Sequence, residues 1–207
     1  MRLSSSSFED GHPIPGDFAF CVPHPDTHAT FGPNRNPALT WTDLPEGTRS
    51  LALICHDPVV PTKPDDVNKE DREVPPDLPR TDFFHWVLVD VDPNMGGIAE
   101  GSCSDGVVPR GKEPAAPFGR HGINDYTNWF AGDEDMGGDY YGYDGPCPPW
   151  NDSLVHHYVF TAYALDVDHV PVDGAFTGVD VRKAIDGHVL ASASTTGTYT
   201  LNPRLRE

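Results

Sequence analysis

The chain has 207 residues and a formal net charge of −18, from 14 basic and 32 acidic residues. That length suffices for one sizeable hydrophobic core and falls short of two typical domains, so we expect a single domain over residues 1–207. So acidic a surface repels nucleic acid and anionic membranes, which excludes both as partners and disfavours stable membrane insertion.

Six short runs rich in Val, Phe, Tyr, Trp or Thr, each bounded by Gly, Pro, Asn or Asp, are typical of β-strands. They lie at residues 18–22, 38–42, 50–56, 84–91, 156–165 and 189–201. One helix is predicted over 177–187, where Thr177 and Asp180 form a capping-box pattern and Gly187 supplies a left-handed stop. The 22 prolines and 20 glycines disfavour long helices. The pattern therefore predicts an all-β fold with few short helices, an antiparallel β-sandwich in which loops at one end build the site.

Two stretches are predicted to be loop insertions between core strands. Residues 62–82 are charged, proline-rich and without hydrophobic periodicity, which favours a surface loop. Residues 93–142 are longer and glycine-rich. They carry five aromatic side chains, Tyr126, Trp129, Phe130, Tyr140 and Tyr141. A loop this aromatic is expected to be ordered, packed either over the site or into a homodimer contact.

Polar side chains extend three of the predicted strands. Alternate side chains of a strand share a face, so Asp57 ends a buried apolar row. By the same rule His156 and Tyr158 share a face, and His85 points to the side of Val87. Polar groups that prolong apolar rows at strand ends can form a shallow pocket above the core.

Each of these residues has a chemical task in a pocket for a small anion. Asp57 can orient one ring nitrogen of a histidine and favour its charged form. His85 and His156 are then candidate donors to the anion, and Tyr158 adds a hydroxyl donor. Gly145, in a turn stiffened by prolines, can leave backbone N–H groups open to the ligand. Each charge-assisted hydrogen bond contributes on the order of 1.5–3 kcal/mol.

The four cysteines, Cys21, Cys55, Cys103 and Cys147, include no C-x-x-C pair, which argues against a zinc knuckle or a dithiol redox site. A chain this long does not require disulfides, and whether all four are reduced is left open. Cys55, inside an apolar run, is expected to be a core residue.

No apolar stretch resembles a secretory signal or a membrane span, so the chain as given is expected in the cytoplasm. The sequence contains no G-x-S-x-G elbow and places no cysteine in an electropositive setting. We therefore expect a binding protein and not an enzyme, and no cofactor is implied.

Three segments together resemble the phosphatidylethanolamine-binding protein family, also called Raf kinase inhibitor proteins, and in particular its bacterial branch. They are the residues 56–61 (His-Asp-Pro-Val-Val-Pro), 83–89 and 143–161, the last containing Gly-Pro-Cys-Pro-Pro and His-His-Tyr. Residues 31–53 and 188–199 resemble the amino- and carboxy-terminal segments of the family. The resemblance implies a Greek-key β-sandwich that binds phosphate or phosphorylated ligands, with phosphoprotein partners and modulation of kinases or other enzymes by docking.

Residue by residue, the anion-site positions of the family match Asp57, Pro61, His85, Gly145, Pro146, His156 and Tyr158. Two positions depart from the family pattern. Val59 stands where Asp-Pro-Asp-Ala-Pro has its second carboxylate, which makes the pocket less negative. His157 replaces the arginine of His-Arg-Tyr, which removes a permanent positive charge near the mouth.

Two alternatives remain at this point. In the first, the pocket is incidental and the aromatic loop at 93–142 is the working surface of a protein-interaction or inhibitor module. In the second, Asp57, His85 and His156 form a two-histidine, one-carboxylate metal site of an enzyme.

Overall fold

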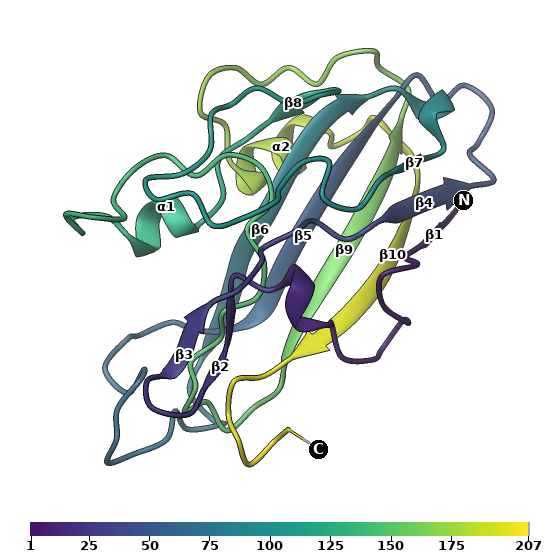
Figure 1. Cartoon of the computed structure of the whole chain (residues 1–207). Coiled ribbons are helices and arrows are strands. Elements are labelled where there is room, and N and C mark those ends of the chain that lie inside the picture. The colour runs from purple at the N-terminus through teal and green to yellow at the C-terminus, as the bar shows by residue number, and fades with distance from the viewer. Residues whose placement is uncertain (207) are drawn as a thin grey trace.

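A computed structural model describes residues 1–206, and antiparallel β-structure dominates it (Figure 1). The central sheet has five strands in the order β10-β9-β5-β6-β8. Their bounds are Ser50–Pro61 for β5, Arg80–Val91 for β6, Arg120–His121 for β8, His156–Leu165 for β9 and Val189–Tyr199 for β10. The predicted fold class, mostly β with few short helices, is confirmed; the Greek-key connection stays a prediction.

Two smaller sheets and two short helices complete the described chain. The three-stranded sheet joins β1 (Arg2–Ser4), β4 (Leu39–Thr42) and β7 (Gly97–Ile98). The two-stranded sheet pairs β2 (Cys21–His24) with β3 (His28–Phe31). The helices are α1 (Tyr126–Trp129) and α2 (Gly178–Ala184), and short 3-10 turns lie at Gly16–Phe18 and Pro93–Met95. The run at 18–22 is therefore only partly a strand, because Phe18 ends a 3-10 turn.

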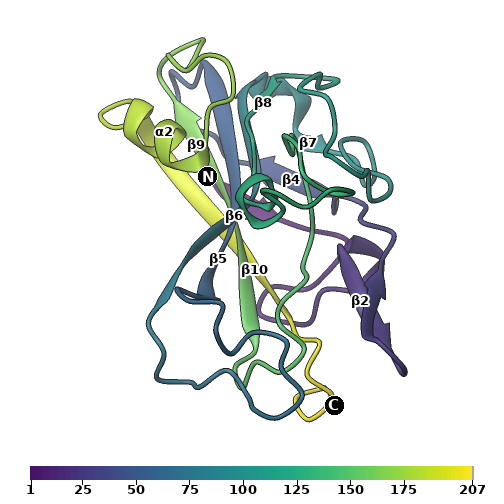
Figure 2. The same ribbon diagram turned by 90° about the vertical axis from the view of Figure 1, so that its left-hand side faces the viewer.

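The central sheet is buried on both faces. One apolar core, which includes Trp41, Leu53 and Phe160, fills the space between the five-stranded and three-stranded sheets. A second core, which includes Ile54 and Val181, packs α2 against the opposite face. Figure 2 shows α2 and the β2–β3 pair on opposite sides of the central strands. This double burial explains why residues 51–55 are continuously apolar and do not alternate.

The predicted capping box is confirmed at the start of α2. The Thr177 side chain accepts a hydrogen bond from the Asp180 backbone N–H, and the Asp180 carboxylate accepts one from the Thr177 backbone N–H. These bonds satisfy backbone donors that the first helical turn leaves unpaired. The helices formed by residues 1–206 all lack the length and apolar character that crossing a membrane requires.

A β-bulge in β6 changes the direction of one predicted site residue. Cys55 on β5 pairs with Trp86 on β6, whereas the next residue, His56, pairs with Phe84. His85 is therefore an extra residue without a partner of its own, and the face of the strand shifts at this point. The prediction that His85 shares the face of Val87 is wrong for this reason. The bulge turns the His85 ring to the opposite side of the sheet, toward Tyr158.

Candidate functional site

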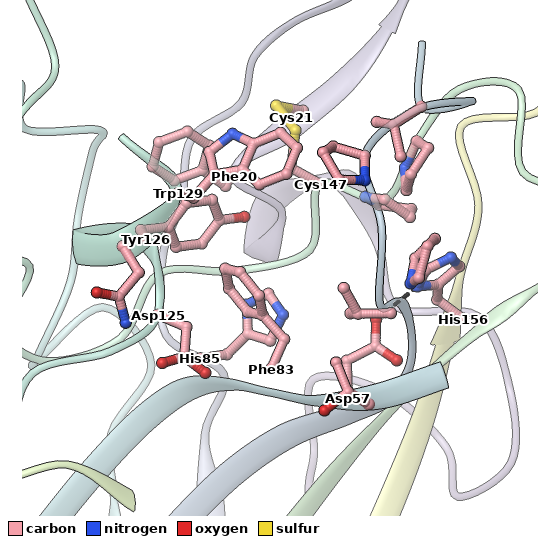
Figure 3. A pocket seen from close by; sticks show the side chains of 18 of the residues that line it. Phe20, Cys21, Asp57, Phe83, His85, Asp125, Tyr126, Trp129, Cys147 and His156 are labelled. Carbon is pink, nitrogen blue, oxygen red and sulfur yellow. Dashed lines mark hydrogen bonds and ion pairs between the residues drawn. A yellow bond between two sulfur atoms is a disulfide. The ribbon is translucent and has the colours of Figure 1, made fainter. Parts of the chain in front are cut away.

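One cavity of about 620 Å³ lies at the end of the central sheet, where β5 ends and β6 and β9 begin (Figure 3). Five of the seven predicted site residues line it: Asp57, Pro61, His85, His156 and Tyr158. They come from β5, β6 and β9, and the paired register of these strands brings them together. Three aromatic residues of the 93–142 loop, Tyr126, Trp129 and Phe130, also line the cavity. Of the two placements expected for that loop, packing over the site is therefore confirmed.

Gly145 and Pro146 lie behind the cavity wall and contribute nothing to its surface. The Gly145 N–H donates to the side-chain oxygen of Asn34 at 2.8 Å, so the expected open N–H for a ligand is wrong. A side chain at Gly145 would meet the Phe18 carbonyl oxygen at 2.0 Å. Glycine is needed here because the backbone of another segment approaches so closely.

His156 is held between two carboxylates at one end of the cavity. Its Nδ1 lies 2.5 Å from an oxygen of Asp57, and its Nε2 lies 3.0 Å from an oxygen of Asp152. All three side chains are 1% exposed, so water does not compete for these bonds. Burial alone would lower the pKa of His156, but the two carboxylates outweigh burial and raise it to about 9.

His156 is therefore an imidazolium whose two N–H groups are both used inside the protein. The expectation that Asp57 favours the charged form of its histidine is confirmed. The expectation that His156 donates to an anion is wrong in this arrangement. Arg80 completes the cluster, because it donates to the Asp152 carboxylate from two nitrogens at 2.6 and 3.1 Å. Although burial acts in the other direction, bonds from His156 and Arg80 lower the pKa of Asp152.

His85 has an uncharged partner instead. Its Nδ1 lies 2.7 Å from the backbone oxygen of Asp144, which fixes the proton on Nδ1. Burial is the largest influence and lowers the pKa of His85 to about 4, so the ring is neutral near pH 7. Its Nε2 is left as an acceptor. Among residues 1–206 no side chain is hydrogen-bonded to that nitrogen or to the Tyr158 hydroxyl, and both residues line the cavity.

A buried polar network fixes the carbonyl that holds His85. The Asp144 carboxylate accepts from Asn34 and Asn124, both at 2.8 Å, and from Lys112 at 2.6 Å. Burial raises the pKa of Asp144, and Lys112 acts against that rise. Two of these partners belong to the 93–142 loop, so that loop positions His85 as well as covering the cavity.

Within residues 1–206, the cavity surface carries two carboxylates and no permanently charged donor. Its ionisable residues include Asp57, Asp125 and His156, and no lysine or arginine of the described chain lines it. Burial raises the pKa of Asp125, whose carboxylate accepts from the Phe84 backbone N–H. Neutral donors are available at Tyr158, Asn68 and Asn128, which also line the cavity.

A disulfide between Cys21 and Cys147 joins β2 to the proline-rich turn, and both residues line the cavity. Sequence reasoning left this pairing open, because four dispersed cysteines allow three pairings. Cys55 is buried in the core as predicted, and Cys103 is a half-buried free thiol. Disulfides persist in oxidising compartments, so the cytoplasmic location stays a prediction.

Sequence reasoning also missed Asp152, Arg80, Asp144 and Lys112. Asp152 had one available signal, its position four residues before His156 in the turn that enters β9. The other three become partners only through long-range packing. Within residues 1–206, no three His, Cys, Asp or Glu side chains are arranged to hold a metal ion, so the metal-site alternative gains no support.

Comparison with known proteins identifies the family. The family model described as phosphatidylethanolamine-binding protein matches residues 4–200. A UPF0098 protein of Chlamydia muridarum is 32% identical over 199 residues, which cover 96% of this chain and 98% of that protein. The crystal structure of Escherichia coli YbcL, described as a member of the mammalian PEBP family, superposes with a TM-score of 0.68 at 24% identity and covers 96% of this chain and 97% of its own. A phosphatidylethanolamine-binding protein homologue of Chlamydia trachomatis gives a TM-score of 0.63 at 29% identity, covering 96% and 95%. The chain belongs to the phosphatidylethanolamine-binding protein family.

Proposed function

We propose that the protein is a non-enzymatic binding protein whose cavity holds a small phosphate- or carboxylate-type head group between His85, Tyr158 and Asp57. The observation that carries this proposal is the pair of polar atoms, Nε2 of His85 and the Tyr158 hydroxyl, which belong to neighbouring residues of the cavity lining and are not hydrogen-bonded to a side chain of the described residues. Their rings lie 5.0 Å apart, edge to face, so a single small group can reach both. The Asp57 carboxylate lines the same cavity.

The hydrogen-bonding groups require that the head group carries a proton. The Tyr158 hydroxyl can donate to an anionic oxygen, whereas neutral His85 and ionised Asp57 can only accept. A phosphate monoester satisfies both demands in its monoanion, which persists below its second pKa of about 6. Its affinity should therefore rise as pH falls. The ligand supplies this pH dependence, since the pKa values of His156 and His85, about 9 and about 4, keep both rings from titrating between pH 5 and 8.

We extend the proposal to phosphorylated partners, including modulation of kinases or other enzymes by docking. The 93–142 loop supports this extension, because it borders the cavity and carries the half-exposed Trp129. A protein that presents a phosphorylated side chain to the cavity would contact that loop at the same time.

The test is titration with methyl phosphate at pH 5.5 and pH 8, followed by NMR and calorimetry. We expect the ring signals of His85 to shift and the affinity at pH 5.5 to be roughly 50- to 100-fold higher than at pH 8, because the monoanion of a group with a second pKa of about 6 almost disappears by pH 8. Tyr158→Phe should weaken binding by about three- to tenfold, the value of one hydrogen bond. Tyr163→Phe is the matched control, because Tyr163 packs against the core under α2 on the other face of β9. Unmoved His85 signals at both pH values would overturn the proposal.

The two carboxylates that line the cavity, Asp57 and Asp125, favour a second candidate, a ligand with an ammonium head group. An ammonium donates three hydrogen bonds and accepts none, which suits a surface with two carboxylates and no lysine or arginine. Methylammonium distinguishes the candidates. If it binds at pH 8 and methyl phosphate fails at pH 5.5, the second candidate replaces the first.

A further inference from the structure

The cavity is larger than a head group requires. Pockets of about 300–1,000 Å³ enclose drug-sized ligands, and the volume here, about 620 Å³, lies within that range. His85, Tyr158 and Asp57 account for the part of the cavity that would hold the head group. The remaining surface must contact some other part of the ligand.

Six aromatic side chains form one wall of that remaining surface, beside prolines, valines and threonines: Phe20, Phe31, Phe83, Tyr126, Trp129 and Phe130. A continuous series of rings runs from Phe31 through Phe20, Tyr126, Phe83 and His85 to Tyr158. Phe31 is 57% exposed and Tyr158 is 1% exposed, so the series leads from solvent to the bottom of the cavity. Figure 3 shows Phe20, Tyr126 and Trp129 gathered at the side of the cavity away from His156.

Contacts within the protein hold the aromatic wall of the cavity in place without a ligand. Phe20 and Tyr126 stack with ring centroids 4.4 Å apart, which fixes α1 against the segment that leads into β2. The Tyr126 hydroxyl donates to the Gly145 carbonyl at 2.8 Å, and the Cys21–Cys147 disulfide ties the same turn to β2. Trp129 is nevertheless 51% exposed, although indole is among the side chains that gain most from burial. Phe31 and Trp129 both line the cavity, so a ligand body could cover both.

We propose that this wall is a subsite for a flat aromatic ring, so that the ligand of the cavity is an aryl compound with its polar head at His85 and Tyr158. The position of the polar head rests on the proposed function. The position of the aromatic ring rests only on the aromatic wall. Neighbouring rings of the wall meet both stacked and edge to face, so the rings of the wall lie in more than one orientation. An aromatic ring of the ligand can pack against these rings in either geometry. Such aromatic pairs contribute binding free energy beyond that of the buried apolar area. A saturated ring of the same size gains only the buried area.

The experiment compares ligands that share a head group and differ in body. Methyl phosphate, cyclohexyl phosphate and phenyl phosphate are titrated at pH 5.5, and benzyl alcohol serves as a ring without an acidic head. We expect phenyl phosphate to bind about 100-fold more tightly than methyl phosphate, and about fivefold more tightly than cyclohexyl phosphate. Benzyl alcohol should bind weakly and shift the Trp129 indole signal.

Variants of the wall test where the gain arises. Trp129→Ala and Phe31→Ala should each reduce the ratio of the methyl phosphate and phenyl phosphate dissociation constants by about five- to tenfold. Val179→Ala is the control, because Val179 is an equally exposed apolar residue on α2, outside the cavity, at 62% exposure. It should leave the ratio unchanged.

The outcomes separate the two proposals. If methyl phosphate binds but phenyl phosphate binds no more tightly than cyclohexyl phosphate, the ring subsite is overturned and the head-group site stands. If the phosphates fail while benzyl alcohol binds and depends on Trp129, the ring subsite stands and the head-group assignment fails. If none of the four compounds binds, both are overturned.

Discussion

At one end of the cavity His156 lies between Asp57 and Asp152, and at the other end His85 has only a backbone carbonyl for a partner. The two rings are almost equally buried, at 1% and 3% exposure. Their pKa values nevertheless move in opposite directions, to about 9 and about 4. The difference teaches that the charge of a buried histidine follows its hydrogen-bond partners, and that burial prevails at His85 although the charge of Asp57 opposes it, because no carboxylate is bonded to that ring. Both ring nitrogens of His156 are therefore paired with carboxylates, whereas one ring nitrogen of His85 is left as an acceptor.

The largest expected effect is on the His156 end. Asp57→Ala leaves a buried imidazolium with one carboxylate in place of two, and we expect the free energy of unfolding to fall by about 3–5 kcal/mol. The control is Asp168→Ala, which removes the same group from an ion pair with Arg49 whose partners are more than half exposed. That change should cost no more than about 1 kcal/mol. Urea unfolding at pH 7 measures both, and equal losses would mean that burial adds nothing to the pair.

The disulfide constrains the turn that runs behind both ends, independently of either histidine. Replacing both Cys21 and Cys147 by serine should lower the free energy of unfolding by about 2–4 kcal/mol, since the bond closes a loop across 126 positions. Cys103→Ser is the control, because Cys103 is a free thiol. A double variant as stable as this control would show that the bond does not contribute in solution.

The smallest expected effect is the pH dependence of stability that arises from the two histidines. The raised pKa of His156 stabilises the fold fully below its ordinary value of 6.5, and this contribution is lost as pH rises through about 9. The lowered pKa of His85 acts in the opposite way, because its contribution is present above 6.5 and is lost as pH falls through about 4. Each amounts to at most about 3 kcal/mol. Burial also lowers the pKa of His121 to about 4, so His121 adds to the loss of stability as pH falls.

His85→Gln separates the two contributions. In this variant the free energy of unfolding should fall less between pH 6.5 and pH 4 than in the wild type. Between pH 6.5 and pH 9.5 it should change as in the wild type, and urea unfolding from pH 4 to 9.5 measures both ranges. If the pH dependence of the free energy of unfolding changed above pH 6.5 instead, the two histidines would be coupled, and their pKa values could not be assigned to separate partners.

Much of the frame could be predicted from the residues alone. The strands at 50–56, 84–91 and 156–165 follow from hydrophobic runs and turn residues, and the capping box at Thr177 follows from local spacing. These features depend on near neighbours in the chain. The bulge at His85 does not, because it arises where the pairing of β5 with β6 shifts by one residue. Alternation counted from Val87 therefore gave the wrong face.

The sequence predicts which residues line the candidate site, but it does not predict which of the two histidines is charged. Asp57, His85, His156 and Tyr158 were all named from the sequence, and all line the cavity. Their protonation depends on Asp152 and on the Asp144 carbonyl, which reach the histidines only in the folded chain. The roles expected for the two histidines, charged donors to an anion, changed once those partners were known.

The most direct test of this account is the protonation of the two rings at pH 7, measured by NMR correlation of the imidazole nitrogens with their ring protons. We predict that both nitrogens of His156 carry protons, that only Nδ1 of His85 does, and that neither ring titrates between pH 5 and 8. If both rings instead titrate together near pH 6.5, the opposite charge states of the two ends would be contradicted.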